Sequence, residues 1–126
     1  MDNLPKEFKY TIHHEWLEKQ GDIVTIGITE HAQQELGDVV HVSLPDYGEY
    51  VDLGDEVVTI EANKSLIELN AAIAGKIVDT NEQLEEAPGL INSAPYDDGW
   101  LYKLEIEDDS QYQELLDFDD YSQYIE

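Results

Sequence analysis

The side chain best placed for chemistry is the amine of Lys64, which lies within the segment Glu61-Ala62-Asn63-Lys64-Ser65-Leu66-Ile67-Glu68. Asn63 and Lys64 form a predicted two-residue turn between two strands, and asparagine tolerates the positive φ that hairpin turns need. Such a turn would expose a primary amine at the tip of a rigid hairpin. The segment therefore makes Lys64 a candidate for an amine presented at a hairpin tip, although an ordinary solvated lysine in a turn would give the same pattern.

The strands on either side of this turn have a pattern that specifies their register. The turn pairs Glu61 with Leu66, Ile60 with Ile67, Thr59 with Glu68, and Val58 with Leu69. One face of the hairpin is then apolar, and the other carries Thr59, Glu61 and Glu68. A shift of one residue would turn the apolar side chains toward water, so the alternation favours this pairing over its neighbours.

The rest of the chain is predicted to form short strands around this hairpin. We expect strands at residues 8–12, 23–28, 39–44, 75–78 and 101–106. One short helix is expected at 30–36, with Thr29 as its N-cap and Gly37 just past its end. Residues 81–100 are expected to be irregular. Short strands with turns about every ten residues are typical of a small all-β sandwich or flattened barrel.

The last part of the chain differs in composition, because nine acidic residues and no basic residue lie between Glu105 and Glu126. Ser110 and Gln113 fit a capping box for a helix that continues to residue 116, and residues 121–125 could add another turn. Five apolar side chains of this tail are expected to pack on the sheets: Leu115, Leu116, Phe118, Tyr121 and Ile125. A frayed acidic tail is the alternative. We predict one domain, 1–126, with a core at about 8–106 and a helical tail at about 107–126.

The composition excludes several classes of partner. The 126 residues include 30 Asp and Glu against six Lys and no Arg, for a formal net charge of −24. A chain without a basic patch is not expected to bind nucleic acid or an anionic membrane surface. The charge suits steering toward basic protein surfaces, and solubility explains it equally well. The sequence shows no signal peptide and no long apolar run, so we expect a cytoplasmic protein of prokaryotic type.

The sequence lacks the motifs of common enzyme classes. It has no cysteine, no phosphate-binding Gly-Lys-Ser/Thr run and no Gly-x-Ser-x-Gly elbow. His14-Glu15 begins like the zinc helix of metalloproteases, but residue 18 is Glu rather than His. The four histidines show no i, i+4 pairing, so no metal site is expected. We therefore expect a carrier whose reactive group is attached to Lys64, rather than an enzyme.

A series of short motifs runs through nearly the whole chain. They are His14-Glu15-Trp16, Gly27-Ile28-Thr29, Ala32-Gln33, Leu36-Gly37-Asp38, Leu44-Pro45 with Gly48, Glu61 with Lys64, Gly75, Pro88-Gly89-Leu90-Ile91-Asn92, and Pro95-Tyr96 with Gly99-Trp100-Leu101. In this order and spacing they resemble the H proteins of the glycine cleavage system. The resemblance implies a barrel-sandwich hybrid, similar to a lipoyl domain, in which Lys64 carries lipoic acid in amide linkage. Glu61 and Asn63 would flank that lysine on the hairpin.

The resemblance also implies partners. The lipoyl arm would accept an aminomethyl group from the pyridoxal-phosphate glycine decarboxylase and deliver it to the tetrahydrofolate-dependent aminomethyltransferase. Dihydrolipoyl dehydrogenase would reoxidise the arm, and a lipoate-protein ligase or lipoyl transferase would attach it. The loaded arm ends in an amine on a labile carbon, which a carboxylate in a poorly hydrated cleft would protect. We expect Glu15, Glu68 and His13 to line that cleft.

Other roles remain open. Around the modified lysine the family usually reads Glu-Ser-Val-Lys-Ala, whereas this chain has Ala62, Asn63 and Ser65 at those positions. We expect the shape of the hairpin to preserve recognition by a lipoylating enzyme. The alternatives are an H-like protein that relays lipoate to other complexes and an unmodified acidic interaction module. A biotin carrier is disfavoured because its lysine is normally flanked by methionines, and Met1 is the only methionine.

Overall fold

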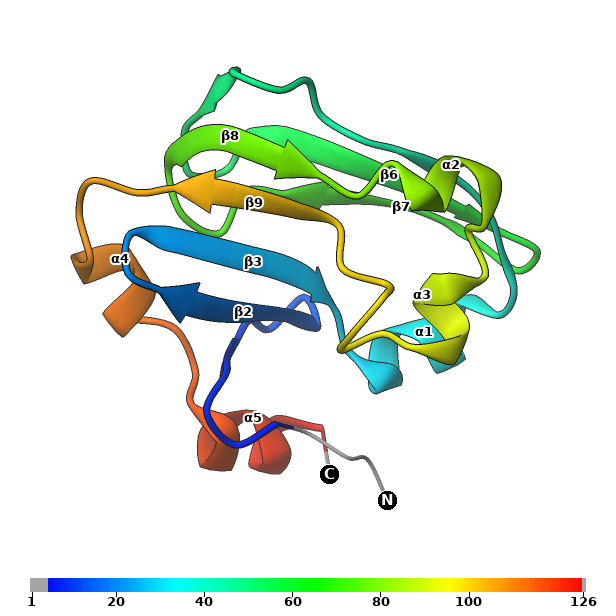
Figure 1. The fold of residues 1–126 in the computed structure, drawn as a ribbon. Helices are drawn as coiled ribbons and strands as arrows, with labels where there is room; N and C mark the ends of the chain where they lie inside the picture. Colours follow the sequence, from blue (N-terminus) through cyan, green and yellow to red (C-terminus); the bar gives the residue numbers. More distant parts are fainter. Residues whose placement is uncertain (1–4, 126) are drawn as a thin grey trace.

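The computed structural model describes residues 5–125, whose strands form two antiparallel sheets (Figure 1). The larger sheet has the strand order β1-β2-β3-β9-β8-β5, and the smaller has the order β4-β6-β7. The strands are β1 Lys9–Tyr10, β2 Glu15–Gln20, β3 Ile23–Ile28, β4 Val39–Ser43, β5 Tyr50–Val51, β6 Glu56–Ala62, β7 Leu66–Asn70, β8 Gly75–Thr80 and β9 Tyr102–Glu105. The helices are α1 Glu30–Leu36, α2 Gln83–Glu86, α3 Leu90–Ser93, α4 Ser110–Gln113 and α5 Phe118–Tyr124.

The core is made by the facing apolar sides of the two sheets. Val24 and Ile26 of β3 join Val58 and Ile60 of β6 in one buried cluster. These β-branched side chains fit a pleated surface and are completely or almost completely shielded from water. Two layers around one such core make a flattened sandwich, and this confirms the predicted all-β fold.

Helix α1 occupies the predicted residues. The Thr29 hydroxyl accepts a hydrogen bond from the Ala32 N–H at 3.3 Å, as expected of an N-cap. Gly37 ends the helix with φ 80°, and its N–H donates to the Gln33 carbonyl at 3.2 Å. Figure 1 shows α1 and α3 at the same end of the molecule as the turn of the β6–β7 hairpin.

Several predicted boundaries were wrong. The first strand covers only Lys9–Tyr10 of the predicted 8–12, whereas β2 is a six-residue strand that the sequence did not reveal. The pattern of β2 was obscured because its first three residues, Glu15 to Leu17, are all buried, so the strand does not alternate. The segment 81–100, expected to be irregular, contains the short helices α2 and α3.

The acidic tail packs on the larger sheet, with a correction to its helices. Helix α4 ends at Gln113, and the Ser110–Gln113 capping box does not form: the Gln113 amide donates instead to the Asp109 carboxylate at 2.6 Å. The expected helix cannot reach residue 116 because the backbone of Leu116 pairs with that of Tyr10. Helix α5 covers residues 121–124 of the predicted turn at 121–125, and its Tyr121 is fully buried and stacked on Tyr10 with ring centroids 4.7 Å apart. All five apolar side chains predicted to pack do so.

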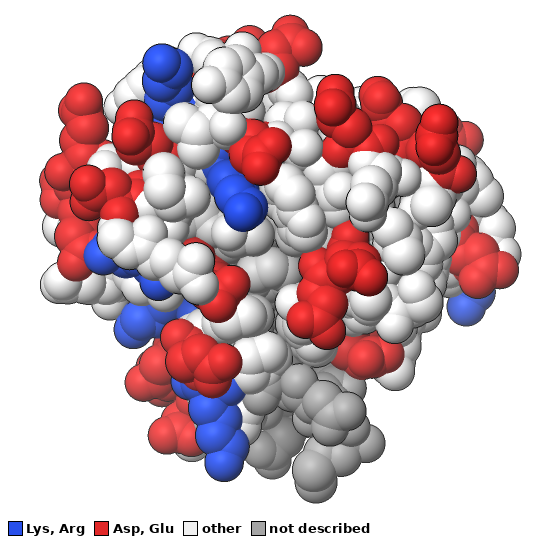
Figure 2. All heavy atoms as spheres, in the orientation of Figure 1, with Lys and Arg blue, Asp and Glu red and all other residues white. Residues whose placement is uncertain are grey.

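The surface charge is dispersed. Figure 2 shows acidic side chains over the whole visible face and only scattered lysines among them. Within residues 5–125, no helix is long and apolar enough to cross a membrane.

Candidate functional site

Lys64 lies at the tip of the β6–β7 hairpin with its side chain exposed. The predicted register is confirmed: Glu61 pairs with Leu66, and Val58 pairs with Leu69. The Ala62 N–H donates to the Ser65 carbonyl at 2.8 Å and closes the turn. Within the described residues, Lys64 forms no ion pair. The fold therefore presents this amine to solvent.

Asn63 has a role that the hairpin pattern did not reveal. It was expected to supply positive φ to the turn, and that prediction was wrong, because His14 is the one non-glycine residue within 5–125 with positive φ. Asn63 instead binds the backbone of Asp38 twice. Its N–H donates to the Asp38 carbonyl at 2.9 Å, and its Oδ1 accepts from the Asp38 N–H at 3.0 Å. These two bonds fix the hairpin tip to the end of α1.

Gly37 makes room for this contact. A Cβ atom at this position would collide with Oδ1 of Asn63 and would lie 3.1 and 3.2 Å from Cδ and Cγ of Lys64. Asn92 of α3 supports the same corner, since its Nδ2 donates to the Gly37 carbonyl at 2.8 Å and its Oδ1 accepts from the Val39 N–H at 2.9 Å. Cγ and Cδ of the Lys64 side chain therefore lie against Gly37, whose backbone is held by a hydrogen bond from Asn92.

A pocket of about 380 Å³ opens along β7. It is lined by Ile12, His13, His14, Ile67, Glu68, Leu69 and Asn70. The lining residues of β7 lie three to six residues from Lys64, or about 10–20 Å along the strand. The structure therefore brings two of the three predicted cleft residues, His13 and Glu68, into one pocket within reach of a long arm on the hairpin tip. Glu61 lies on the same hairpin, exposed and paired with His41 of β4.

The pocket has an acidic side chain, Glu68, in its lining. The carboxylate of Glu68 raises the pKa of Glu56 on the neighbouring strand, first through a hydrogen bond and then through its charge. His14 forms the other side, and burial lowers its pKa, with a smaller effect from the neighbouring His31. The sequence-based prediction named His13 and not His14, although the two residues are adjacent and His14 belongs to the His14-Glu15-Trp16 motif.

The third predicted residue, Glu15, does not line the pocket. Its side chain is 1% exposed, and its Oε1 accepts a hydrogen bond from the Thr11 hydroxyl at 3.1 Å. Its Oε2 and the hydroxyl of Tyr102 are both buried without a hydrogen-bond partner. Burial raises the pKa of Glu15 to about 7. The structure thus places this carboxyl in the interior.

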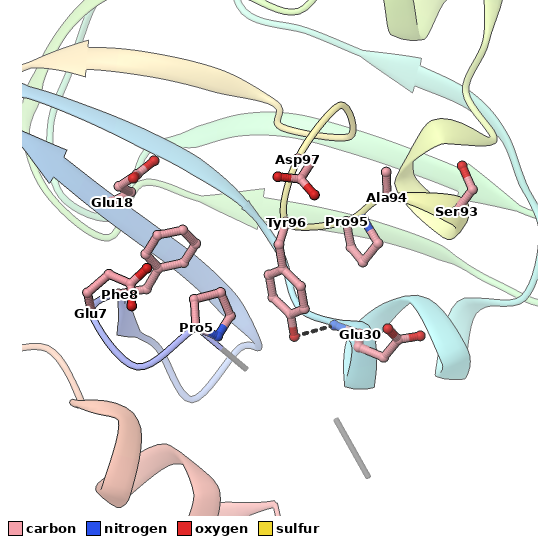
Figure 3. Close-up of a pocket in the computed structure, with 10 residues that line it drawn as sticks. All are labelled: Pro5, Glu7, Phe8, Glu18, Glu30, Ser93, Ala94, Pro95, Tyr96 and Asp97. Carbon is pink, nitrogen blue, oxygen red and sulfur yellow. Dashed lines mark hydrogen bonds between the residues drawn. The ribbon is translucent and has the colours of Figure 1, made fainter. Parts of the chain in front are cut away.

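A larger pocket of about 530 Å³ lies elsewhere (Figure 3). Its sides carry the carboxylates of Glu7, Glu18, Glu30 and Asp97, and the hydroxyl of Tyr96 accepts a hydrogen bond from the Glu30 N–H at 2.9 Å. None of its lining residues belongs to the β6–β7 hairpin. Size alone therefore does not identify the functional site.

Comparison with known proteins identifies the family. The family model of the glycine cleavage H-protein matches residues 8–126. The chain belongs to this family. It is 48% identical over 122 residues to the glycine cleavage system H protein of Staphylococcus epidermidis, covering 97% of both chains. It is 46% identical over 127 residues to that of Pectobacterium atrosepticum, covering 100% of this chain and 98% of the relative. The crystal structure of a glycine cleavage system H protein from Mycobacterium marinum superposes with a TM-score of 0.86 at 34% identity, over 95% of this chain and 97% of that one.

Membership of the H-protein family confirms several expectations. The chain is a carrier subunit of the glycine cleavage system and not a catalyst, and its cofactor is lipoate bound covalently to a lysine. The other components of that system are its partners. The family assignment does not specify which lysine carries lipoate or which surface receives the lipoyl arm, and the positions of Lys64 and the pocket along β7 provide candidates for both.

Proposed function

We propose that Lys64 is the lysine that carries lipoate. The main support for this proposal is the position of Lys64 at the tip of a paired hairpin. Its side chain is exposed there and forms no ion pair within residues 5–125. Two of the other lysines have amines in contact with neighbouring groups, since Lys19 lies 3.5 Å from Asp109 and Lys103 lies over the ring of Trp100. Lys9 and Lys76 lie within the strands β1 and β8 rather than at a hairpin tip. The Lys64 side chain is exposed at the hairpin tip, so the site fits an acyl group on its amine.

The individual partners form a second part of this proposal. Lys64 would hold the lipoate, whose disulfide would supply the acceptor for an aminomethyl group. The individual partners would be the glycine decarboxylase that provides this group, the aminomethyltransferase that receives it, and dihydrolipoyl dehydrogenase, which would restore the disulfide. A lipoate-protein ligase or lipoyl transferase recognises the hairpin, with Glu61 and Asn63 beside the lysine. The Asn63–Asp38 hydrogen bonds hold the hairpin in one position for these enzymes. The cytoplasmic location expected from the sequence is part of the same proposal.

The pocket along β7 is proposed as the shelter for the loaded arm. Ile12 and Ile67 offer apolar surface, and the carboxylate of Glu68 offers a negative charge to a cationic amine. His13 closes the opposite side of the pocket. Glu15 is two residues after His13 in the sequence, and its buried carboxyl, with a pKa of about 7, adds negative potential only when it is ionised.

The attachment site is tested by intact mass after incubation with lipoate, ATP and a lipoate-protein ligase. The wild-type chain and the control Lys76→Arg should each gain one lipoyl group, and Lys64→Arg should gain none. A lipoyl adduct on Lys64→Arg would overturn the assignment. Reconstituted glycine cleavage with the lipoylated chain then separates the glycine cleavage role from lipoate relay, since a relay protein would be modified but would not support turnover.

The shelter is tested by timing hydrolysis of the loaded arm. Glu68→Gln, alone and combined with Glu15→Gln, should hydrolyse faster than wild type, whereas Glu105→Gln on β9 should not. Equal rates in all four proteins would remove Glu68 and Glu15 from the proposal.

A further inference from the structure

Three potential metal ligands from two separate elements meet at one place on the surface. His14, His31 and Glu35 each offer one ligand atom, and these atoms all lie within 4.8 Å of one another. His31 and Glu35 are one turn apart on α1, with Nε2 of His31 3.7 Å from Oε2 of Glu35. The ring of His14, which comes just before β2, lies beside that of His31 with centroids 4.5 Å apart. The fold therefore gathers two imidazoles and a carboxylate.

The ring of His14 is held in place from several sides. Its backbone has φ 67°, a conformation that non-glycine residues adopt only where the surrounding structure enforces it. Its N–H donates to the Thr11 carbonyl at 3.1 Å, and its carbonyl accepts from the Thr29 N–H at 2.9 Å. Its Nδ1 lies 2.8 Å from the hydroxyl of the buried Tyr121, which leaves Nε2 available. A hydrogen bond to the second ring nitrogen is the usual way in which proteins orient a metal-binding histidine.

We propose that His14, His31 and Glu35 form a binding site for one late first-row divalent cation such as Zn²⁺. Two imidazole nitrogens and one carboxylate oxygen suit such a cation, whereas Mg²⁺ and Ca²⁺ prefer sites made of oxygen. Three protein ligands leave a fourth position to solvent.

The geometry needs only small adjustments to close around an ion. Tetrahedral Zn²⁺ with bonds of about 2.0–2.1 Å separates its ligand atoms by about 3.3 Å. The His31–Glu35 pair is already at 3.7 Å, and the side chains of His31 and Glu35 are 30% and 66% exposed, so both are free to turn. His14 stays fixed and the two residues of α1 move toward it.

This cluster could not be predicted from the spacing of the histidines. The expectation that they have no metal role rested on the lack of i, i+4 pairing between them, whereas His14 and His31 are distant in sequence and meet where the Thr29 N–H donates to the His14 carbonyl. The proposal does not depend on which lysine carries lipoate.

Calorimetric titration of ZnCl₂ into the full, untagged chain tests the site. The unmodified protein is used because a dithiol would itself bind Zn²⁺, and excess Mg²⁺ occupies the dispersed surface carboxylates. We expect one Zn²⁺ per chain, with affinity at least about tenfold weaker in His31→Gln and in Glu35→Gln. The matched controls are His41→Gln on β4 and Glu30→Gln on α1, which should bind as wild type does.

Two results of the titration would overturn the proposal. One is the absence of Zn²⁺ binding above the Mg²⁺ background, and the other is equal binding by all variants. Histidine side-chain NMR of the wild-type chain supplies a readout that does not depend on a variant folding: Zn²⁺ should shift the signals of His14 and His31 and leave those of His41 in place. Shifts confined to other histidines would also refute it.

Discussion

Glu15 provides the sharpest test of the structure, through the pH dependence of stability. Its carboxyl is 1% exposed, and burial raises its pKa from an ordinary 4.5 to about 7. The folded state therefore disfavours the ionised form. Stability from this group is fully present below pH 4.5 and is lost as the pH rises through about 7.

The size of the effect follows from the gap between the two pKa values. At about 1.36 kcal/mol per pH unit, the gap from 4.5 to about 7 corresponds to a total loss of about 3 kcal/mol. Most of this loss, about 2.5 kcal/mol, falls between pH 5 and pH 8. A glutamine at this position does not ionise, so it should remove this part of the pH dependence.

The measurement is urea unfolding of wild type and Glu15→Gln from about pH 5 to about pH 8 at constant ionic strength. Any constant cost of the amide in the buried site cancels, because the comparison uses the change with pH in each protein. The other acids contribute equally to both proteins and cancel in the difference. Glu105→Gln, exposed on β9, is the control and should retain the wild-type slope.

Parallel slopes for wild type and Glu15→Gln would refute the reasoning. They would mean that Glu15 ionises in the folded protein as easily as in the unfolded chain. Burial would then not disfavour the ionised form of this carboxyl in the folded protein.

Four further predictions follow from contacts described above. Asn63→Ala removes the side-chain bond to Asp38 and should cost about 0.5–1.5 kcal/mol, with slower lipoylation measured by timed intact mass. Gly37→Ala places a Cβ at φ 80° against the hairpin tip and should cost about 1–3 kcal/mol, with faster hydrogen exchange at the tip. Tyr121→Phe removes the hydroxyl that lies 2.8 Å from Nδ1 of His14 and 2.8 Å from Oγ1 of Thr29, and should cost about 1–3 kcal/mol by urea unfolding. Moderate salt should raise the melting temperature relative to low salt, because the charge of −24 repels itself; a flat response in a thermal scan would contradict this.

The hairpin and α1 could be predicted because their signals are local. Alternation along Val58–Ile60 and Ile67–Leu69 has one register that buries the apolar face, and Thr29 and Gly37 bracket α1. The same local reasoning failed at Ser110, where a capping pattern was present but the pairing of Leu116 with Tyr10 ended the helix.

The site was predictable only where its residues are close in sequence or share a known motif. Lys64 follows from the turn, and His13 and Glu68 were expected together because of a resemblance. The partner of Asn63 is 25 residues away, and nothing in a turn pattern indicates it. Glu15 was expected to line the cleft because it belongs to the His14-Glu15-Trp16 motif and a carboxylate would protect the loaded arm, and only the packing of β2 shows that this side chain is buried.

The two hydrogen bonds between Asn63 and Asp38 affect how a group carried on Lys64 reaches the partner proteins. A tip held by two backbone contacts of Asp38 acts as a fixed pivot, so any group on Lys64 samples a volume set by its own length alone. Restricting that volume raises the local concentration of the group at a partner docked on the same end of the molecule. Loosening the anchor would therefore slow transfer between docked partners even if every chemical group remained intact.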